Sequence, residues 1–330
     1  EEPGATVPET WVPWLDRLRA AASPDEVRGI LAALREELFS LSPEEAVARI
    51  EAFLQSGLDA RTGLAFEVGP GGRLRGAASL RAQLLDWLGQ IDPARSAQWA
   101  RNELTTLGTG LLPDVYVIHL RNFAWGTGLP EADAHTFLRD QFGQLIRHQP
   151  WIREPSSAIA ESMDVAVYTD ATEFTPELNA LMQPGRPRML RHAASLTLER
   201  LVDRRPVETL SLLLEEADRP TPLPKARAGY FARIDPGHPE AARILDPYLA
   251  APGVDRGEAV RFLQSFPNLN QSLSHNLLSS NISMTTAAEA AGRLQAALDH
   301  VRRWRSDPAM EALAEKLAET ADRIRRQLGQ

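Results

Sequence analysis

LLDWLGQIDPARSAQWARNEL (Leu84–Leu104) is the stretch that decides the fold of this chain. Its first half spaces leucines and an isoleucine three or four positions apart, which predicts one apolar stripe along a helix. Asp92 and Pro93 then predict the start of a second helix. Proline is tolerated at the first helical position, and the carboxylate before it can accept a hydrogen bond from a free amide. The apolar spacing resumes from Ala97 to Leu104, so the stretch predicts a helix, a turn and a second helix.

Two short helices joined in this way each bury one face, and the outer face of the pair needs a further neighbour, which stacking supplies. Prolines at expected helix starts lie 37 residues apart from Pro93 to Pro130 and 33 residues apart from Pro206 to Pro239, enough for two helices and two turns. We therefore predict an all-α fold of stacked antiparallel helical hairpins.

Other helix starts are marked by capping signals. Ser23–Glu26 and Ser42–Glu45 have the Ser-x-x-Glu pattern of a capping box, with proline at the first helical position. They predict helices that begin near Pro24 and Pro43. Proline also marks further expected starts: Pro113, Pro130, Pro155, Pro176, Pro206, Pro239 and Pro308.

One stretch near residues 64–75 does not follow the helical pattern. Leu64–Val68 alternates apolar and other residues, and Gly69-Pro70-Gly71-Gly72 follows, which predicts one small β-hairpin or an ordered loop. A phosphate-binding loop would need a Gly-Lys-Ser or Gly-Lys-Thr ending at a fixed spacing, and this ending is missing. We expect no phosphate site here.

The pattern divides the chain into four parts. We expect an N-terminal tether at 1–10, a helical-hairpin repeat domain at 11–264, an Asn/Ser-rich connection at 265–285 and a C-terminal hairpin at 286–330. Asparagine and serine compete with the helix backbone for hydrogen bonds, so the connection should be irregular.

The C-terminal hairpin carries two apolar stripes that should face each other. One comprises Leu294, Leu298, Val301 and Trp304, and the other comprises Met310, Leu313, Leu317, Ile324 and Leu328. The pair is predicted to cap the array, because a terminal repeat must shield apolar surface on one side and face water on the other. A detachable arm that binds a partner is the alternative.

Composition and charge exclude several classes of protein. The 330 residues are 43% hydrophobic and 24% charged, typical of a folded, soluble protein, and charges interrupt every apolar run before it could span a membrane. The net charge of −8 disfavours nucleic acid as a partner. The absence of cysteine excludes disulfides and thiol chemistry. The chain begins at Glu1 without methionine, so we expect an exported, for example periplasmic, protein, with the cytoplasm as the alternative.

The repeated pattern resembles HEAT-type α-solenoid repeats. Four stretches carry the resemblance: WLGQIDPARSAQWA (87–100), RLVDRRPVETLSLL (200–213), RIDPGHPEAARILD (233–246) and WRSDPAMEALAEKL (304–317). The period is uneven, residues 58–76 and 265–286 do not fit, and no ladder of Asp and Arg recurs at one repeat position. The resemblance implies a scaffold or binding role, and it supplies no catalytic residue.

No familiar catalytic, metal or cofactor motif is present, so we expect no catalytic residues, no metal and no cofactor. Within Asp114–Trp125, five residues share one helical face and could line a groove: Val115, Ile118, His119, Asn122 and Trp125. The favoured alternative is that His119 and Asn122 form hydrogen bonds to a neighbouring turn inside the stack.

Two functions remain open. We expect a non-enzymatic helical-repeat scaffold that binds a protein or peptide partner, although the sequence identifies neither the binding residues nor the oligomeric state. The rival is a carbohydrate-active enzyme with an (α/α) toroid fold, in which paired carboxylates would act on the substrate. Four tryptophans could then stack on sugars: Trp87, Trp99, Trp125 and Trp151.

Overall fold

The computed structural model describes residues 8–218, 221–270, 277–279 and 285–329. The chain forms two compact units, Glu1–Val165 with His275–Ser280 and Ala166–Ser274 with Asn281–Gln330. Residues 1–7 of the expected tether, and 271–276 and 280–284 of the expected connection, lie outside the described residues.

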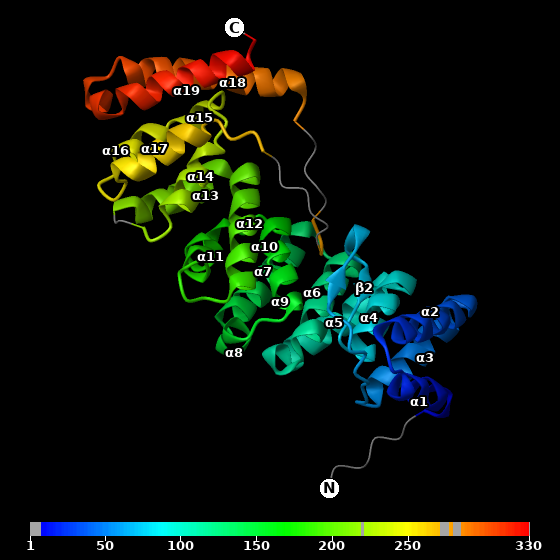
Figure 1. Cartoon of the computed structure of the whole chain (residues 1–330). Helices are drawn as coiled ribbons and strands as arrows, with labels where there is room; N and C mark the ends of the chain where they lie inside the picture. Colours follow the sequence, from blue (N-terminus) through cyan, green and yellow to red (C-terminus); the bar gives the residue numbers. More distant parts are fainter. Residues whose placement is uncertain (1–7, 219–220, 271–276, 280–284, 330) are drawn as a thin grey trace. The chain divides into compact units, whose positions relative to one another are not determined.

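The first unit, coloured blue to green in Figure 1, is built of helices with one small β-hairpin. Its helices are α1 (Val12–Ala20), α2 (Pro24–Ser40), α3 (Pro43–Gln55), α4 (Leu80–Ile91), α5 (Pro93–Thr106), α6 (Pro113–Gly126), α7 (Glu131–Arg147), α8 (Gln149–Arg153) and α9 (Ser157–Ser162). The boundary with the second unit lies within α10 (Asp164–Tyr168).

The second unit is helical in all its regular described elements. They are α11 (Thr175–Leu181), α12 (Arg188–Arg204), α13 (Pro206–Glu215), α14 (Pro224–Ala232), α15 (Pro239–Ala242), α16 (Leu245–Ala250), α17 (Arg256–Ser265), α18 (Ala287–Arg305) and α19 (Ala314–Gln327), with short 3-10 turns between some of them. The all-α prediction is confirmed.

The predicted β-hairpin is also present. Strands β1 (Glu67–Val68) and β2 (Leu74–Gly76) pair in antiparallel fashion, and they form the one sheet among the described residues. The glycine-rich turn between them contains a 3-10 turn at Pro70–Gly72, in which Gly71 and Gly72 adopt positive φ angles of 67° and 74°. Glycine suits this turn because L-residues with a side chain rarely adopt such angles.

The stretch from Leu84 to Leu104 forms the predicted hairpin of α4 and α5. Asp92 is the N-cap of α5, where its carboxylate accepts the amide of Arg95 at 2.9 Å. Helix α5 also packs against α6, and the two backbones approach so closely that a Cβ on Gly126 would lie 2.0 Å from the carbonyl oxygen of Pro93. Neighbouring helices thus bury the outer face of the α4–α5 pair.

The two predicted capping boxes differ in detail. The box at Ser42 is complete, since Ser42 accepts the amide of Glu45 and Glu45 accepts the amide of Ser42. At the start of α2, Ser23 accepts the amide of Glu26 at 3.2 Å, but the Glu26 carboxylate binds the amide of Ala22 instead. This second box is therefore an N-cap without its reciprocal bond.

Two of the four stretches with the repeat pattern depart from a pair of full helices. After Asp235-Pro236, the second helix is divided into α15, of four residues, and α16, of six. After Asp307, the chain first forms a 3-10 helix at Pro308–Leu313, and α19 begins only at Ala314. The pattern marks the helix start at Pro239 correctly, but the α-helix expected from Pro308 begins six residues later, and helix lengths are overstated.

The C-terminal hairpin of α18 and α19 packs within the second unit. The predicted stripes contain buried residues on both helices, among them Leu298 and Leu317, which are 0% and 1% exposed. Helix α19 also contacts α17, where Thr320 donates a hydrogen bond to the carbonyl of Leu263 at 3.1 Å and Arg323 donates another at 3.0 Å. Helix α19 thus packs against two neighbours in the second unit, α17 and α18.

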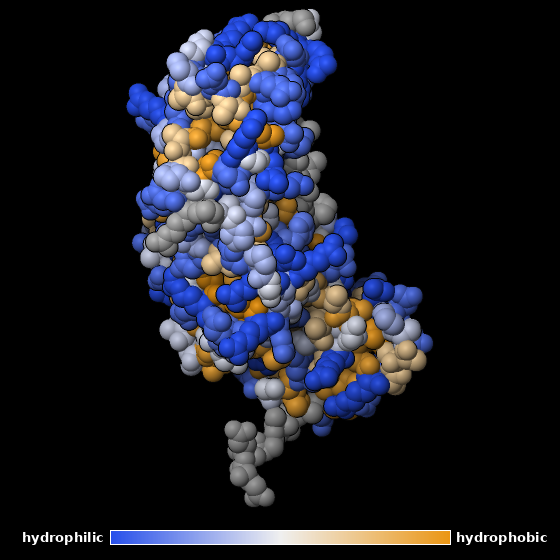
Figure 2. Space-filling model, turned by 60° about the vertical axis from the view of Figure 1, so that its left-hand side comes forward, coloured by the Kyte–Doolittle hydropathy of each residue, from blue (hydrophilic) through white to orange (hydrophobic). Residues whose placement is uncertain are grey.

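The face of the molecule that Figure 2 shows is mainly hydrophilic. In the view of Figure 2, blue residues dominate, with smaller orange patches between them. Five large apolar side chains are classed as exposed among the described residues: Val12, Phe39, Leu107, Leu112 and Met189. Among the described residues, no helix has the length and apolar character needed to cross a membrane.

Candidate functional site

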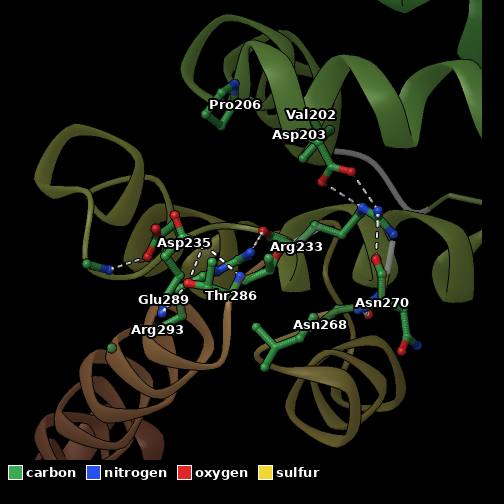
Figure 3. A pocket seen from close by; sticks show the side chains of 14 residues that line it. Val202, Asp203, Pro206, Arg233, Asp235, Asn268, Asn270, Thr286, Glu289 and Arg293 are labelled. Atoms are coloured by element: carbon green, nitrogen blue, oxygen red, sulfur yellow. Dashed lines mark hydrogen bonds and ion pairs between the residues drawn. The ribbon is translucent and has the colours of Figure 1, made fainter. Parts of the chain in front are cut away.

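An open cavity of about 730 Å³ lies within the second unit (Figure 3). Its walls come from the end of α12, the start of α13, the turn after α14, residues 268–270 and the first turns of α18. The lining residues are Val202, Asp203, Pro206, Arg233, Asp235, Gly237, Asn268, Leu269, Asn270, Thr285, Thr286, Glu289, Gly292 and Arg293. This cavity is larger than two others in the same unit, of about 510 and 460 Å³.

Arg233 forms one buried wall of the cavity. Its guanidinium donates to both oxygens of Asp203, at 3.0 and 2.7 Å, and to the carbonyl of Asn270 at 3.0 Å. Figure 3 shows it between these two residues. Burial alone would lower the pKa of Arg233, but the hydrogen bonds and charge of Asp203, with the charge of Glu199, raise it. Arg233 therefore stays charged and joins α12 to the 268–270 segment.

The three carboxylates that line the cavity all accept hydrogen bonds from the protein itself. Asp203 binds Arg233, and Asp235 accepts the amide of Gly237 at 2.9 Å. Glu289 completes a capping box at the start of α18, where it accepts the amide of Thr286 at 2.7 Å and its hydroxyl at 2.8 Å. These bonds, the backbone bond first, lower the pKa of Glu289. Each carboxylate thus has a structural role.

Arg293 is a cation of the cavity lining whose guanidinium is only partly hydrogen-bonded. It lies one turn after Glu289 on α18, and its Nη2 donates to the carbonyl of Arg233 at 2.8 Å. Its Nε is buried and has no hydrogen-bond partner among the described residues. Arg293 also forms no ion pair with a carboxylate among the described residues, so its charge on the cavity lining favours a ligand that brings an acceptor oxygen.

The cavity carboxylates bear on the carbohydrate-active alternative. Glycoside hydrolysis needs one carboxyl group as a proton donor and a second as base or nucleophile. Here Asp203 is held by Arg233 and Glu289 caps a helix. The described residues also contain no group of three or more His, Asp or Glu side chains arranged to hold a metal ion.

The groove considered on Asp114–Trp125 is not formed. Four of its five residues are buried in the first unit: Val115 at 2%, Ile118 at 0%, His119 at 1% and Asn122 at 0% exposure. Asn122 donates to the carbonyl of Leu85 at 2.8 Å, which lies inside helix α4 and not in the neighbouring turn that the favoured alternative expected. His119 Nδ1 has no hydrogen-bond partner among the described residues.

The four tryptophans considered for sugar stacking lie in the first unit. Trp87 and Trp151 are buried, at 2% and 8% exposure, whereas Trp99 and Trp125 are half-buried. The Trp125 ring lies under the guanidinium of Arg121, 4.0 Å from the ring centroid. None of the four lines the cavity described above.

Sequence reasoning does not single out the residues of the cavity. Arg233 and Asp235 lie in RIDPGHP, a stretch that indicates no more than an ordinary turn between repeats. Thr286 and Glu289 form a Thr-x-x-Glu capping pattern that could have been found, and it would have marked the start of α18. No local signal links Arg293 to Arg233, because 60 residues separate them.

Comparison with known proteins identifies no relative, since no family model, curated protein or solved structure matches the chain.

Proposed function

We propose that the chain is a non-enzymatic, HEAT-like helical-repeat scaffold that binds a peptide segment of a partner protein in the cavity of the second unit. Packed neighbouring helices with loops at their ends support this proposal, because such arrays present concave surfaces to partners. The cavity is open and has both polar and apolar lining residues, which suits a peptide main chain with side chains on either side.

The observation that carries the proposal is the state of Arg293. It lines the cavity and has no carboxylate partner among the described residues, whereas the three cavity carboxylates already accept bonds from the protein. A peptide offers carbonyl oxygens along its whole length, and an acidic side chain or a terminal carboxylate would be the strongest acceptor. We therefore favour a peptide with a carboxylate near Arg293.

A displayed library of random peptides, selected on the full-length chain, tests the proposal. The enriched peptides should carry Asp, Glu or a free C-terminus, and calorimetric titration should measure their Kd. Arg293→Gln should weaken binding at least about tenfold, since a hydrogen bond to a charged group contributes about 1.5–3 kcal/mol. The matched control is Arg305→Gln, an exposed arginine on the same helix outside the cavity, which should leave the Kd unchanged.

Two results would overturn the proposal. Equal binding by wild type and Arg293→Gln would show that the peptide does not bind in this cavity. Reproducible turnover of a polysaccharide by the full-length chain, abolished by Asp235→Asn, would replace the scaffold with the carbohydrate-active alternative.

A further inference from the structure

A short segment from far along the chain is seated on the first unit. Leu277, Leu278 and Ser279 are the described residues of His275–Ser280, which belongs to the first unit although its sequence neighbours belong to the second. Figure 1 shows it as a short orange stretch beside the helices of that unit. Leu277 is 0% exposed. The first unit therefore buries one side chain of this segment completely.

The backbone of the segment is held by one carboxylate. Asp164, which follows α9, accepts the amides of Leu278 and Ser279 through one oxygen, at 2.7 and 2.8 Å. Its other oxygen accepts the Ser279 hydroxyl. Two successive amides on one charged acceptor form strong hydrogen bonds, and they require that neither residue be proline.

A glycine makes room for the preceding carbonyl. A Cβ on Gly72 would lie 2.3 Å from the carbonyl oxygen of Leu277 and 3.2 Å from the ring of Trp125. Gly71, the neighbour with nearly the same positive φ, has no atom within 4 Å of such a Cβ. The carbonyl of Leu277 can therefore lie here only because residue 72 is glycine and has no side chain. The neighbouring Gly71 is not required in this way.

Buried polar residues fix this surface in place. Arg121, 0% exposed, donates to the carbonyl of Gly72 at 2.8 Å, and its guanidinium lies over the ring of Trp125. Arg121 is paired with Asp86, which also accepts the amide of Leu74 in β2 at 3.1 Å. One buried ion pair thus holds the glycine turn and the Trp125 ring together.

We propose that Gly72, Trp125 and Asp164 form a docking cradle for short peptides, occupied by the chain's own residues 277–279, and that a peptide of the same chemistry from another protein can replace them. The peptide that fits carries a leucine, then two residues with free amides, the second of them serine. This site is separate from the cavity of the second unit and does not depend on the function proposed for it.

Replacement must compete with a tethered occupant. A segment on the same chain is present at an effective concentration that can reach the millimolar range, so a free peptide should bind the wild type weakly. Leu277→Ala removes the buried side chain from the resident segment and leaves its amides in place. This variant should expose the cradle to a competing peptide.

Fluorescence anisotropy with the labelled peptide HNLLSS, the sequence of residues 275–280, tests the proposal on the full-length chain. Leu277→Ala should bind this peptide at least about tenfold more tightly than the wild type does. The control peptide HNLLPS, which lacks both the second amide and the serine hydroxyl that Asp164 accepts, should bind Leu277→Ala at least about tenfold more weakly than HNLLSS does.

A matched pair of glycine variants locates the binding. Gly72→Ala added to Leu277→Ala should abolish binding of HNLLSS, whereas Gly71→Ala added to the same variant should retain it, because both glycines carry the same backbone strain and only Gly72 contacts the segment. The proposal is overturned if Leu277→Ala fails to bind HNLLSS, binds it no better than the wild type, or binds HNLLPS equally well. It is also overturned if Gly71→Ala and Gly72→Ala have the same effect.

Discussion

Single glycines in this protein have opposite roles that their local sequence does not distinguish. Gly126 ends α6 against the backbone of α5, where a Cβ would lie 2.0 Å from the carbonyl oxygen of Pro93. Gly29 lies inside α2 on an exposed face, where a Cβ would have no atom within 4 Å. The first glycine is required by packing, and the second only weakens its helix.

We therefore expect alanine to have opposite effects at these two positions. Gly126→Ala should destabilise the first unit by about 2–3 kcal/mol, because two backbones must separate. Gly29→Ala should stabilise the same unit by about 0.5–1 kcal/mol, because alanine is the better helix former. Chemical denaturation of both variants measures the difference. Similar changes in both would mean that the α5–α6 contact is less close than described.

Two titratable residues of the first unit, the half-buried Glu161 and the buried His119, should give opposite dependences of stability on pH. Burial first, and the charge of Asp164 second, raise the pKa of Glu161 to about 7. The unfolded chain releases this proton near pH 4.3, so the folded state binds it more tightly and loses stability as the pH rises from about 4.3 to about 7. Between pH 5 and pH 8, wild type should lose about 1 kcal/mol more than Glu161→Gln, a figure reduced for partial solvent exposure.

For His119, the stability of the folded state should depend on pH in the opposite sense. Burial first, and the charge of Arg81 second, lower the pKa of His119 to about 3. The unfolded chain takes up this proton near pH 6.5, so stability rises with pH from about 3 to about 6.5. His119→Leu should flatten this rise, which denaturation curves at pH 4 and pH 7 can measure. A variant as sensitive to acid as the wild type would show that His119 is not held neutral.

At the scale of helices, the C-terminal hairpin offers the clearest test. Leu317 of α19 is 1% exposed, and α19 packs against both α18 and α17. Leu317→Asp buries a charge without a partner and should destabilise the second unit by at least about 3 kcal/mol. Ala314→Asp, at the exposed first position of the same helix, should change stability by less than about 0.5 kcal/mol.

Deletion of the C-terminal hairpin tests whether it caps the array or is a detachable arm that binds a partner. Deletion of residues 286–330 would uncover apolar residues of α17, including Leu263, which is 0% exposed. The shortened chain should melt at a lower temperature and associate. An unchanged midpoint in both the deletion and Leu317→Asp would refute the cap and favour the detachable arm.

At the scale of the whole molecule, each of the two compact units has its own buried core. Chains with more than one such unit often depart from two-state unfolding. Scanning calorimetry should therefore give a calorimetric enthalpy larger than the van't Hoff enthalpy, with two component transitions. Gly126→Ala should lower the component of the first unit, and Leu317→Asp that of the second. A single transition moved equally by both variants would contradict this prediction.

The sequence by itself determined the fold class and most helix starts, and it left the stretch near 64–75 open between a β-hairpin and an ordered loop. Prolines at the first helical position, Ser and Asp caps and apolar spacing act over four or five residues, so they can be read without knowing the fold. Helices that begin at Pro24, Pro43, Pro93, Pro113 and Pro206 show this. Helix length was predicted less well after Asp235 and Asp307, where tertiary packing outweighs local preference.

Only the tertiary structure decided which polar groups meet. Arg233 and Arg293 are 60 residues apart, and Asp164 and Ser279 are 115 residues apart. An apolar stripe determines which face of a helix is buried. It does not determine the neighbouring helix, because the hydrophobic effect is non-directional and many apolar surfaces can cover the stripe almost equally well. Hydrogen bonds and ion pairs require particular atoms at fixed distances, so their partners are settled only once the helices have packed. The cavity and the cradle therefore could not be located from sequence.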